Sequence, residues 1–359
     1  MVNGLLTFRI VLIFCGCLLL LVSDLEAQGG GSSATYEDTL EVYEDLFGRE
    51  DALNMTLKSD FKTFKRTRTK DIYLPADMTC IVSDSFQVSH PVRLKARGIY
   101  RKAKCDMPPI WLNIRYAGIE TKELAGVRKM KMVTVCRSGD QYLNYLLREY
   151  LVYKIYNLLT PYSYRVRLIN LKMVNTGRDN KESFCWAFLI EPDELMAGRL
   201  RAKVIKSDKL AMRTVNREAM DRLAMFQYMI GNSDYSVTGR HNLRILGNQT
   251  SGPSGLIPVP YDFDFTGIVN ASYATPNETL PIWSVKERYF VGPCRDNRAS
   301  YESAIAALEA VRDEIESTIW AFDYLDEEDR FDMIGYVESF FNTAENERFI
   351  DREISQTCK

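Results

Sequence analysis

Lys129-Met130-Lys131-Met132-Val133-Thr134-Val135 is the stretch at which the chain changes from one periodicity to another. Its first residues alternate between polar and apolar, which predicts a strand with Lys131 pointing away from the core. The segment 142–159 that follows instead carries apolar residues at intervals of three and four, which predicts a helix of four to five turns ended by Pro161. The first half of the chain therefore contains both strand and helix.

Short strand-like runs lie on both sides of this step. They precede it at 72–74, 92–97 and 110–114, and follow it at 165–174 and 183–190. Several consecutive runs of this kind predict an antiparallel sheet with one face open to solvent or to a ligand.

From about residue 195 the pattern becomes helical. Amphipathic helices are predicted at 211–230, 301–322 and 329–341. We therefore expect an α+β fold of two lobes, strand-rich at 71–194 and helix-rich at 195–359, with a cleft between them.

The first 27 residues have the features of an export signal. Arg9 precedes a nearly unbroken apolar run at 10–22, which is too short to span a bilayer comfortably, and Ala27 offers a small residue at a cleavage point. Cys17 lies inside this run, so lipoprotein anchoring is not expected. A linker and N-terminal extension are expected at 28–70.

Charge excludes some classes of partner. The chain has 46 basic and 48 acidic side chains, a net charge of −2, so nothing favours nucleic acid or an anionic membrane. No second apolar stretch approaches transmembrane length. We expect an exported mature protein, in the periplasm, at the cell surface or secreted.

Cysteines and histidines restrict the chemistry further. Six cysteines follow the signal, an even number compatible with up to three disulfides. Cys294 lies in a tight Gly-Pro-Cys turn, where we expect a disulfide. With only His90 and His241 in the chain, neither a Cys/His zinc site nor a nucleophilic triad is expected beyond what His241 alone could support.

One segment carries a carboxylate suited to phosphoryl transfer. Gly231-Asn232-Ser233-Asp234 follows an apolar helix, so the Asp234 carboxylate emerges at a helix-to-loop junction, where it could orient an acceptor hydroxyl. The alternative is that these are ordinary helix-capping and turn residues.

A second segment, Pro260-Tyr261-Asp262-Phe263-Asp264-Phe265, places two carboxylates on one side of a strand end. Together with Asn242, at the start of an earlier strand, Asp262 and Asp264 form an oxygen-only ligand set that suits Mg²⁺ or Mn²⁺. The alternative is a simple turn after Pro260. Large apolar residues flank the carboxylates, however, and burying an unpaired carboxylate is costly unless a cation compensates.

Lys131 and Glu149 indicate a nucleotide contact. A strand lysine paired with a glutamate of the next helix is how kinases hold nucleotide phosphates, although each residue alone is more typical of a solvated charge. Lys95 and Arg97 share a strand face and are weaker candidates for phosphate contacts. The chain has no glycine-rich phosphate loop.

The order of these segments resembles a known family. Val92–Gly98, Leu146–Leu151, Phe188–Glu191, Asn232–Asn242 and Pro260–Asp264 are similar to the CotH-type, spore-coat-kinase-like family and, more distantly, to HipA-like atypical kinases. The similarity covers roughly residues 70–270 and implies a two-lobed protein-kinase-like fold with a strand-rich N-lobe and a helix-rich C-lobe.

The resemblance also implies roles. The implied assignments are Asp234 as the catalytic carboxylate, Asn242, Asp262 and the supporting acid Asp264 at the metal, Lys131 and Glu149 at the nucleotide phosphates, and Glu191 near the connection between lobes. With Arg97, the residues Lys131, Glu149 and Glu191 form the expected nucleotide-binding set. One spacing differs: those families place the metal-binding Asn five residues after the catalytic Asp, whereas here position five is Gly239 and Asn242 lies eight residues on. The loop is either three residues longer or its metal site is altered.

We therefore expect an exported, kinase-like phosphotransferase that uses Mg²⁺ or Mn²⁺ and moves phosphate from ATP to a hydroxyl of a protein or small molecule. Nucleotidyl transfer is an alternative, because the same metal site can present another phosphorus to attack. A catalytically inactive binding module of the same fold is the other, because ATP is scarce outside the cytosol.

Overall fold

The computed structural model describes residues 46–83, 86–114, 129–207, 210–247, 252 and 254–359. All of them belong to one compact unit, Tyr36–Lys359. The export signal expected at 1–27 and the first part of the linker expected after it lie outside the described residues.

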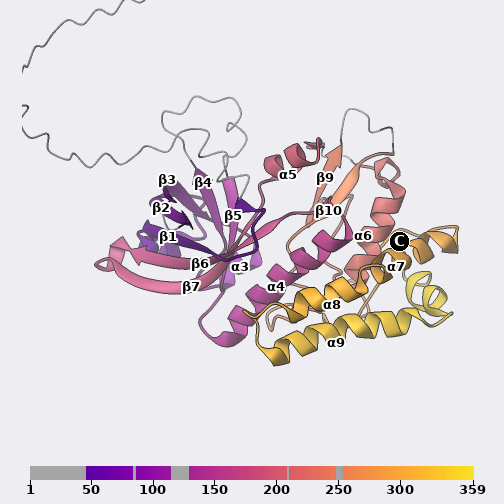
Figure 1. Cartoon of the computed structure of the whole chain (residues 1–359). Helices are drawn as coiled ribbons and strands as arrows, with labels where there is room; N and C mark the ends of the chain where they lie inside the picture. Colours follow the sequence, from indigo (N-terminus) through magenta and orange to yellow (C-terminus); the bar gives the residue numbers. More distant parts are fainter. Residues whose placement is uncertain (1–45, 84–85, 115–128, 208–209, 248–251, 253) are drawn as a thin grey trace, which may run out of the picture. The chain divides into compact units, whose positions relative to one another are not determined.

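Seven strands close into a barrel in the first half of this unit (Figure 1). They are β1 (Leu53–Ser59), β2 (Leu74–Ser83), β3 (Phe86–Ala96), β4 (Ile110–Ile114), β5 (Lys129–Thr134), β6 (Val166–Asn175) and β7 (Lys181–Ile190). Their order around the barrel is β1-β2-β3-β4-β5-β7-β6, with β1 next to β6.

The strand that closes the barrel is β1. Met55 lies opposite Cys80 of the antiparallel β2 and opposite Leu171 of β6, and the β1–β6 pair is parallel. The other neighbouring strands are antiparallel, so the barrel is mixed. Both β1 and the helix after it, α2 (Phe61–Thr67), come from the segment expected to be a linker and extension.

The expectation of a two-lobed, protein-kinase-like fold is therefore wrong. The sheet is a closed seven-stranded mixed barrel accompanied by helices, and only the coarser expectation of mixed strands and helices holds. The physical reason is that alternation identifies a strand but not its partner. Closure depends on pairing β1 with β6, which lies more than a hundred residues away, and such a non-local contact leaves no periodic signal.

Alternation along the strands separates the barrel interior from its outer surface. Leu112, Met132 and Leu189 fill the interior, whereas Val133 and Phe188, one step along their strands, belong to a second apolar cluster outside the barrel. Lys131 also faces outward, as its position between Met130 and Met132 predicts. The outer surface of β5 and β7 is thus built to receive other elements.

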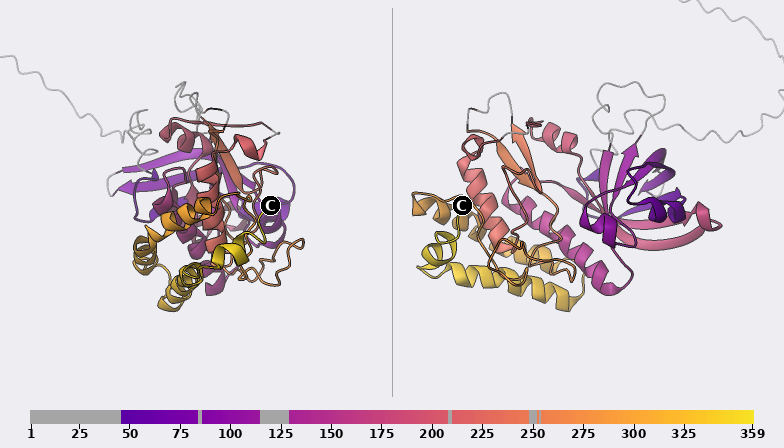
Figure 2. Two further views of the ribbon diagram at one scale, coloured as in Figure 1. Left: turned by 90° about the vertical axis from the view of Figure 1, so that its right-hand side faces the viewer. Right: turned by 180° about the vertical axis from the view of Figure 1, so that it is seen from behind.

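The helix α4 (Asp140–Leu159) lies against β6 and β7, and α8 lies between α4 and α9 (Figure 2). The other helices and short turns are α3 (Tyr100–Lys104), η2 (Thr176–Arg178), α5 (Asp193–Arg199), η3 (Met212–Thr214), α6 (Arg217–Met229), α7 (Arg298–Glu309), α8 (Arg312–Trp320), α9 (Glu327–Ala344) and the π-helical η4 (Ile350–Ile354). Within the described residues, none of the helices combines the length and apolar character needed to cross a membrane.

A small second sheet joins the two motif segments. Its order is β10 (Ile257–Pro260), β9 (Leu243–Gly247) and β8 (Lys203–Val204), all antiparallel. Because Pro260 lies opposite Leu243, the residues just beyond that pair meet, and the Tyr261 N–H donates to the Asn242 carbonyl (3.0 Å). The sheet thereby brings Asn242 next to the Asp262 segment.

Two disulfides are present, Cys105–Cys136 and Cys294–Cys358, so the disulfide expected at Cys294 is confirmed. Cys80 and Cys185 are free. They lie in one row across four strands, Cys80 opposite Met55, Met55 opposite Leu171 and Leu171 opposite Cys185, so three strand spacings, about 14 Å along the curved barrel wall, separate them. A third disulfide between them is geometrically excluded.

Candidate metal centre

The loop that carries Asp234 begins with a glycine that the backbone requires. Gly231 follows the C-cap of α6 with φ +67°, a left-handed conformation, and a Cβ there would collide with the hydroxyl of Tyr336. Next to it, the buried Asn232 donates to Gln227 Oε1 (2.9 Å) and accepts from the Asp234 N–H (2.8 Å). The C-terminal end of α6 therefore fixes the position of the Asp234 backbone.

Both oxygens of that carboxylate have partners. His241 Nε2 lies 2.9 Å from Asp234 Oδ1, and Asn242 Nδ2 donates to Asp234 Oδ2 (3.1 Å). The longer loop folds back on itself through paired backbone hydrogen bonds between Ser236 and His241, which returns Asn242 to Asp234. Burial raises the pKa of Asp234, although His241 beside it acts in the opposite direction.

Three other carboxylates gather where α4 meets the strand end of β10. Glu149 of α4, Asp262 and Asp264 each offer an oxygen within 4.8 Å of the others, and we call this set the acidic triad. Glu149 is 1% exposed and Asp264 is 7% exposed at the side chain, whereas Asp262 is 29% exposed and forms the open side. Such close like charges, taken out of water, require a cation.

Arg101, on the short helix α3, supplies a cation to all three carboxylates. It donates from Nη1 to Glu149 Oε2 (2.9 Å) and from Nη2 to Asp262 Oδ1 (3.0 Å), while Nε lies 3.1 Å from Asp264 Oδ2. No local pattern predicts this role, because Arg101 lies in the basic run 101–104 and is 48 and 161 residues from two of its partners.

The pKa values of the triad reflect its excess of negative charge. Burial raises the pKa of Asp264 to about 8 against the pull of Arg101, and burial likewise raises the pKa of Glu149. Burial opposes ionisation of Asp262 too, but Arg101, Arg97 and Lys131 around it hold its pKa below the usual value. Burial therefore outweighs the nearby positive charge at Asp264 and Glu149 but not at Asp262.

These residues fit a divalent metal. Oδ2 of the buried Asp264 forms an ion pair with Arg101 Nε but accepts no hydrogen bond from any of the described residues, so its bonding capacity is not fully used. The donor set is all oxygen, which is the set preferred by Mg²⁺ and Mn²⁺. Asp262 has φ +67°, a costly conformation for a side-chain-bearing residue, and its N–H is held by the Tyr153 hydroxyl (2.8 Å). The acidic triad can hold a metal ion.

The predicted metal ligands are thus only partly brought together. Asp262 and Asp264 lie in the triad, and Glu149, which the sequence assigned to the nucleotide, is its third member. Asn242, predicted as a ligand, donates its side-chain N–H groups to Asp234, and a metal contact through its carbonyl oxygen stays a prediction. The sequence signal for Asp262 and Asp264 was the Asp-x-Asp pattern with flanking aromatic residues.

Lys131 is paired with Asp193 rather than with Glu149. Its Nζ lies 3.1 Å from Asp193 Oδ1 and 4.4 Å from the centre of the Tyr261 ring, and Arg244 Nε donates to Asp193 Oδ2 (2.7 Å). Burial lowers the pKa of Lys131 to about 8, although Asp193 favours the charged form. Lys131 is therefore buried and close enough to Asp262 to lower the pKa of that carboxyl, and its predicted contact with a nucleotide stays a prediction.

Arg97 and Glu191, the other residues predicted to bind a nucleotide, lie in different surroundings. Arg97 lies over the Trp111 ring (5.5 Å) and is close enough to Glu149 and Asp262 to affect their pKa values. Glu191 is completely buried and accepts hydrogen bonds from Arg165 and Arg199, which accounts for its burial without a ligand. A nucleotide contact by Arg97 or Glu191 stays a prediction. Lys95 pairs with Asp71.

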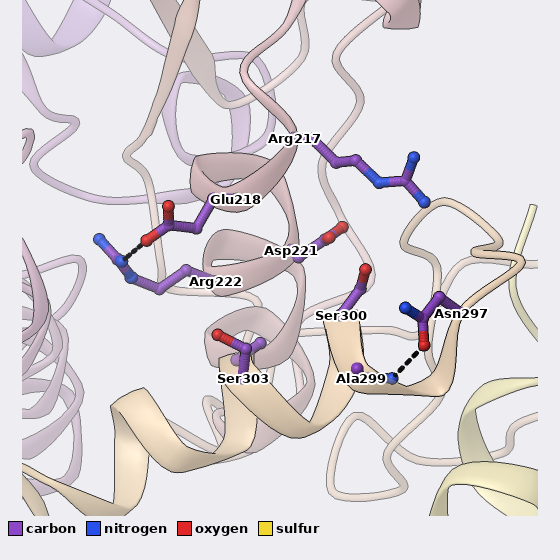
Figure 3. Close-up of a pocket in the computed structure, with 9 residues that line it drawn as sticks. Arg217, Glu218, Asp221, Arg222, Asn297, Ala299, Ser300 and Ser303 are labelled. Carbon is purple, nitrogen blue, oxygen red and sulfur yellow. Dashed lines mark hydrogen bonds and ion pairs between the residues drawn. The ribbon is translucent and has the colours of Figure 1, made fainter.

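A separate cavity of about 340 Å³ lies between α6 and α7 (Figure 3). Its polar residues largely satisfy one another: Arg222 donates to Glu218, the Asn297 side chain caps α7 at the Ala299 N–H, and Asp221 binds Arg295. None of the predicted site residues lines it. The acidic triad is the stronger candidate.

Compared with protein-family models, the chain matches none, and no curated protein matches it significantly. The likeness to CotH-type and HipA-like kinases therefore rests on the motifs quoted above and stays a prediction.

Proposed function

We propose that this protein is an exported, metal-dependent phosphotransferase that moves phosphate from a nucleotide such as ATP to a hydroxyl of a protein or small molecule. The observation that carries the proposal is the acidic triad, with three clustered carboxylates and an open side at Asp262. The proposal rests on the chemistry of these residues, because a closed barrel gives no support from fold.

The metal would be held by Asp262 and Asp264, with Glu149 as the third carboxylate. A divalent ion bound there supplies positive charge to the phosphoryl group being transferred and to the leaving oxygen. Mg²⁺ and Mn²⁺ suit an all-oxygen donor set, which is why we propose one of them.

Asp234 is suited to positioning the acceptor hydroxyl. His241 and Asn242 hold its two oxygens, and the Tyr261–Asn242 backbone bond ties this loop to the triad segment. Because burial raises the pKa of Asp234 while His241 opposes the rise, the carboxylate can accept a hydrogen bond from a hydroxyl and take up its proton as transfer proceeds.

Arg97 and Lys131 supply positive charge beside the triad. Both act on Asp262, and the Lys131 ammonium lies near the rings of Tyr261, Tyr164 and Trp111. Phosphate oxygens of a nucleotide placed at Asp262 would therefore meet cations from the barrel strands.

A catalytically silent binding module is the second candidate, and one observation favours it. Arg101 already contacts all three carboxylates, as an internal cation would in a site that no longer needs a metal. Nucleotidyl transfer on the same metal site is the remaining alternative. The two disulfides fit the oxidising compartment that an exported protein reaches.

The test is ligand-dependent stability followed by label transfer. The melting temperature of the full chain would be followed with Mn²⁺ and ATP, since a ligand at 100 times its Kd stabilises by about 2.7 kcal/mol. Transfer of label from γ-labelled but not α-labelled ATP is expected. Transfer from α-labelled ATP would indicate nucleotidylation, and binding without transfer would indicate the silent module.

The matched control is Asp221→Asn. Asp221 is a buried carboxylate bound to Arg295, far from the proposed chemistry in the α6–α7 cavity, so its loss should lower stability but not metal-induced stabilisation. Asp262→Asn should remove that stabilisation. If neither metal nor nucleotide shifts the melting temperature of the unmodified chain, both enzyme proposals fail.

A further inference from the structure

Arg101 reaches more carboxylates than an ordinary ion-pair arginine. Besides the contacts above, Nη2 also lies 3.2 Å from Glu149 Oε1, so both Glu149 oxygens are bonded to the guanidinium. By contrast, Arg101 donates to only one oxygen of Asp262, and its contact with Asp264 Oδ2 is not a hydrogen bond. Arg101 thus contacts all three carboxylates but engages Glu149 most fully, and the second Asp262 oxygen, on the most exposed of the three side chains, receives no contact from it.

We propose that Arg101 takes the place of a second metal ion, so that the triad binds one divalent cation where a two-metal site would bind two. This inference rests on the proposed function. In two-metal phosphoryl-transfer sites the ions lie about 3.5–4 Å apart and share carboxylate ligands. Here a guanidinium already makes the shared contacts on the Glu149 side.

Charge balance also favours a single divalent cation. The three carboxylates carry three negative charges when ionised, Arg101 contacts all of them, and Arg97 and Lys131 lie close enough to act on Asp262, so a single divalent ion is enough to compensate the negative charge that remains. A second divalent ion would leave excess positive charge among buried groups, which is as costly as the excess negative charge it replaces.

The guanidinium is built into the structure rather than free to leave. The disulfide Cys105–Cys136 fixes the chain at the end of α3, and Arg68 donates to two carbonyls of the same helix. On the other side, the Tyr100 ring packs edge-on against Phe265 and stacks on Tyr273. A metal ion entering the triad would therefore meet Arg101 in place.

The stoichiometry of Mn²⁺ alone tests this on the full, disulfide-bonded chain without nucleotide. Electron paramagnetic resonance during a Mn²⁺ titration is expected to show about one bound ion per chain with the spectrum of an isolated ion. A spectrum of two exchange-coupled ions per chain would overturn the inference while leaving the proposed function intact. Absence of any bound ion would overturn both.

Arg101→Ala provides the second arm, with Lys104→Ala as control. Lys104 is an exposed cation on the same helix, so its removal should leave one bound ion with unchanged affinity. Arg101→Ala should bind about two ions, with the first at least about tenfold tighter because a nearby positive charge is gone. A variant that binds one ion with unchanged affinity would overturn the inference. If Arg101→Ala does not fold, the spectrum of the unmodified chain still decides.

Discussion

Two buried acidic sites in this protein have opposite ratios of carboxylates to contacting guanidinium groups. Glu191 is a single carboxylate with no exposed surface, and it accepts side-chain hydrogen bonds from two guanidinium groups, Arg165 and Arg199. The acidic triad is the reverse, with three carboxylates around the single guanidinium of Arg101.

The difference shows how the ratio of cations to carboxylates separates structural pairs from binding sites. A carboxylate that contacts more than one cation has no uncompensated negative charge, so the fold alone explains its burial. Burial, with a smaller contribution from the neighbouring carboxylates, raises the pKa of Asp264 against the pull of Arg101, and its Oδ2 has an ion-pair contact but no hydrogen bond within the described residues. The triad is therefore where an external cation has the largest effect.

The largest effect is expected for Asp262→Asn. The substitution removes a negative charge from the open side of the triad, so phosphate transfer should fall by about 10³-fold or more if the metal contributes several kcal/mol to the barrier. Initial rates with γ-labelled ATP and Mn²⁺ measure this. A variant that retained more than a tenth of the transfer rate would contradict the role of Asp262.

Glu191→Gln should act on stability instead. Two guanidinium groups would lose their charged partner, at a cost of about 2–3 kcal/mol, below the range for fully buried pairs because both arginines are partly exposed. Urea unfolding gives the loss, and the Mn²⁺ affinity should be unchanged. A loss of Mn²⁺ affinity without a loss of stability would erase the distinction between the two clusters.

Asp193 resembles Glu191 in having two cationic partners, Lys131 and Arg244, but one of them, Lys131, can lose its charge within an accessible pH range. Burial lowers the pKa of its partner Lys131 to about 8, below the unfolded value of about 10.4, so between these limits the unfolded chain binds more protons than the folded one. Stability should therefore rise with pH above about 8, by at most about 1.4 kcal/mol per pH unit from this group.

Lys131→Met should remove that rise, whereas Lys104→Met should keep it. Urea unfolding of the three proteins between about pH 8 and 9 tests the difference, because the cysteines and tyrosines that ionise in the unfolded chain contribute equally to all three. A slope that is equal in all three proteins would show that Lys131 titrates as it does in water.

His241→Ala should have the smallest effect. Its contact with Asp234 is between two side chains that are each about half exposed, and Asn242 still holds the carboxylate. We expect the transfer rate to fall about threefold, equivalent to less than 1 kcal/mol, with no change in Mn²⁺ affinity. A tenfold change in Mn²⁺ affinity would place Asp234 within the metal site.

The sequence identified elements whose signal is local. Alternation located the residues of β3, β4 and β5, and the three-to-four spacing located α4, because each period is set by the geometry of its own element. The closed barrel could not be predicted, since β1 gains its place only by pairing with the distant β6. That missing contact is why the two-lobed expectation was wrong.

The residues of the site also fall into two groups, those that the local sequence predicts and those that only the fold brings to the site. Asp262 and Asp264 lie two residues apart among aromatic residues, so their proximity and burial follow from the sequence. Arg101 and Asp193 reach their partners only through the fold. Glu149 was selected because it follows a strand lysine, yet the structure gives it Arg101 as a partner and gives Lys131 to Asp193.

Direct Mn²⁺ binding is the measurement that bears most closely on the central claim. Equilibrium dialysis of the full chain without nucleotide, compared with Asp262→Asn and the control Asp221→Asn, would report the affinity of the triad for metal. The account predicts saturable binding in the unmodified chain and in Asp221→Asn, weakened about a hundredfold or more in Asp262→Asn. No saturable binding, or equal binding in all three proteins, would contradict it.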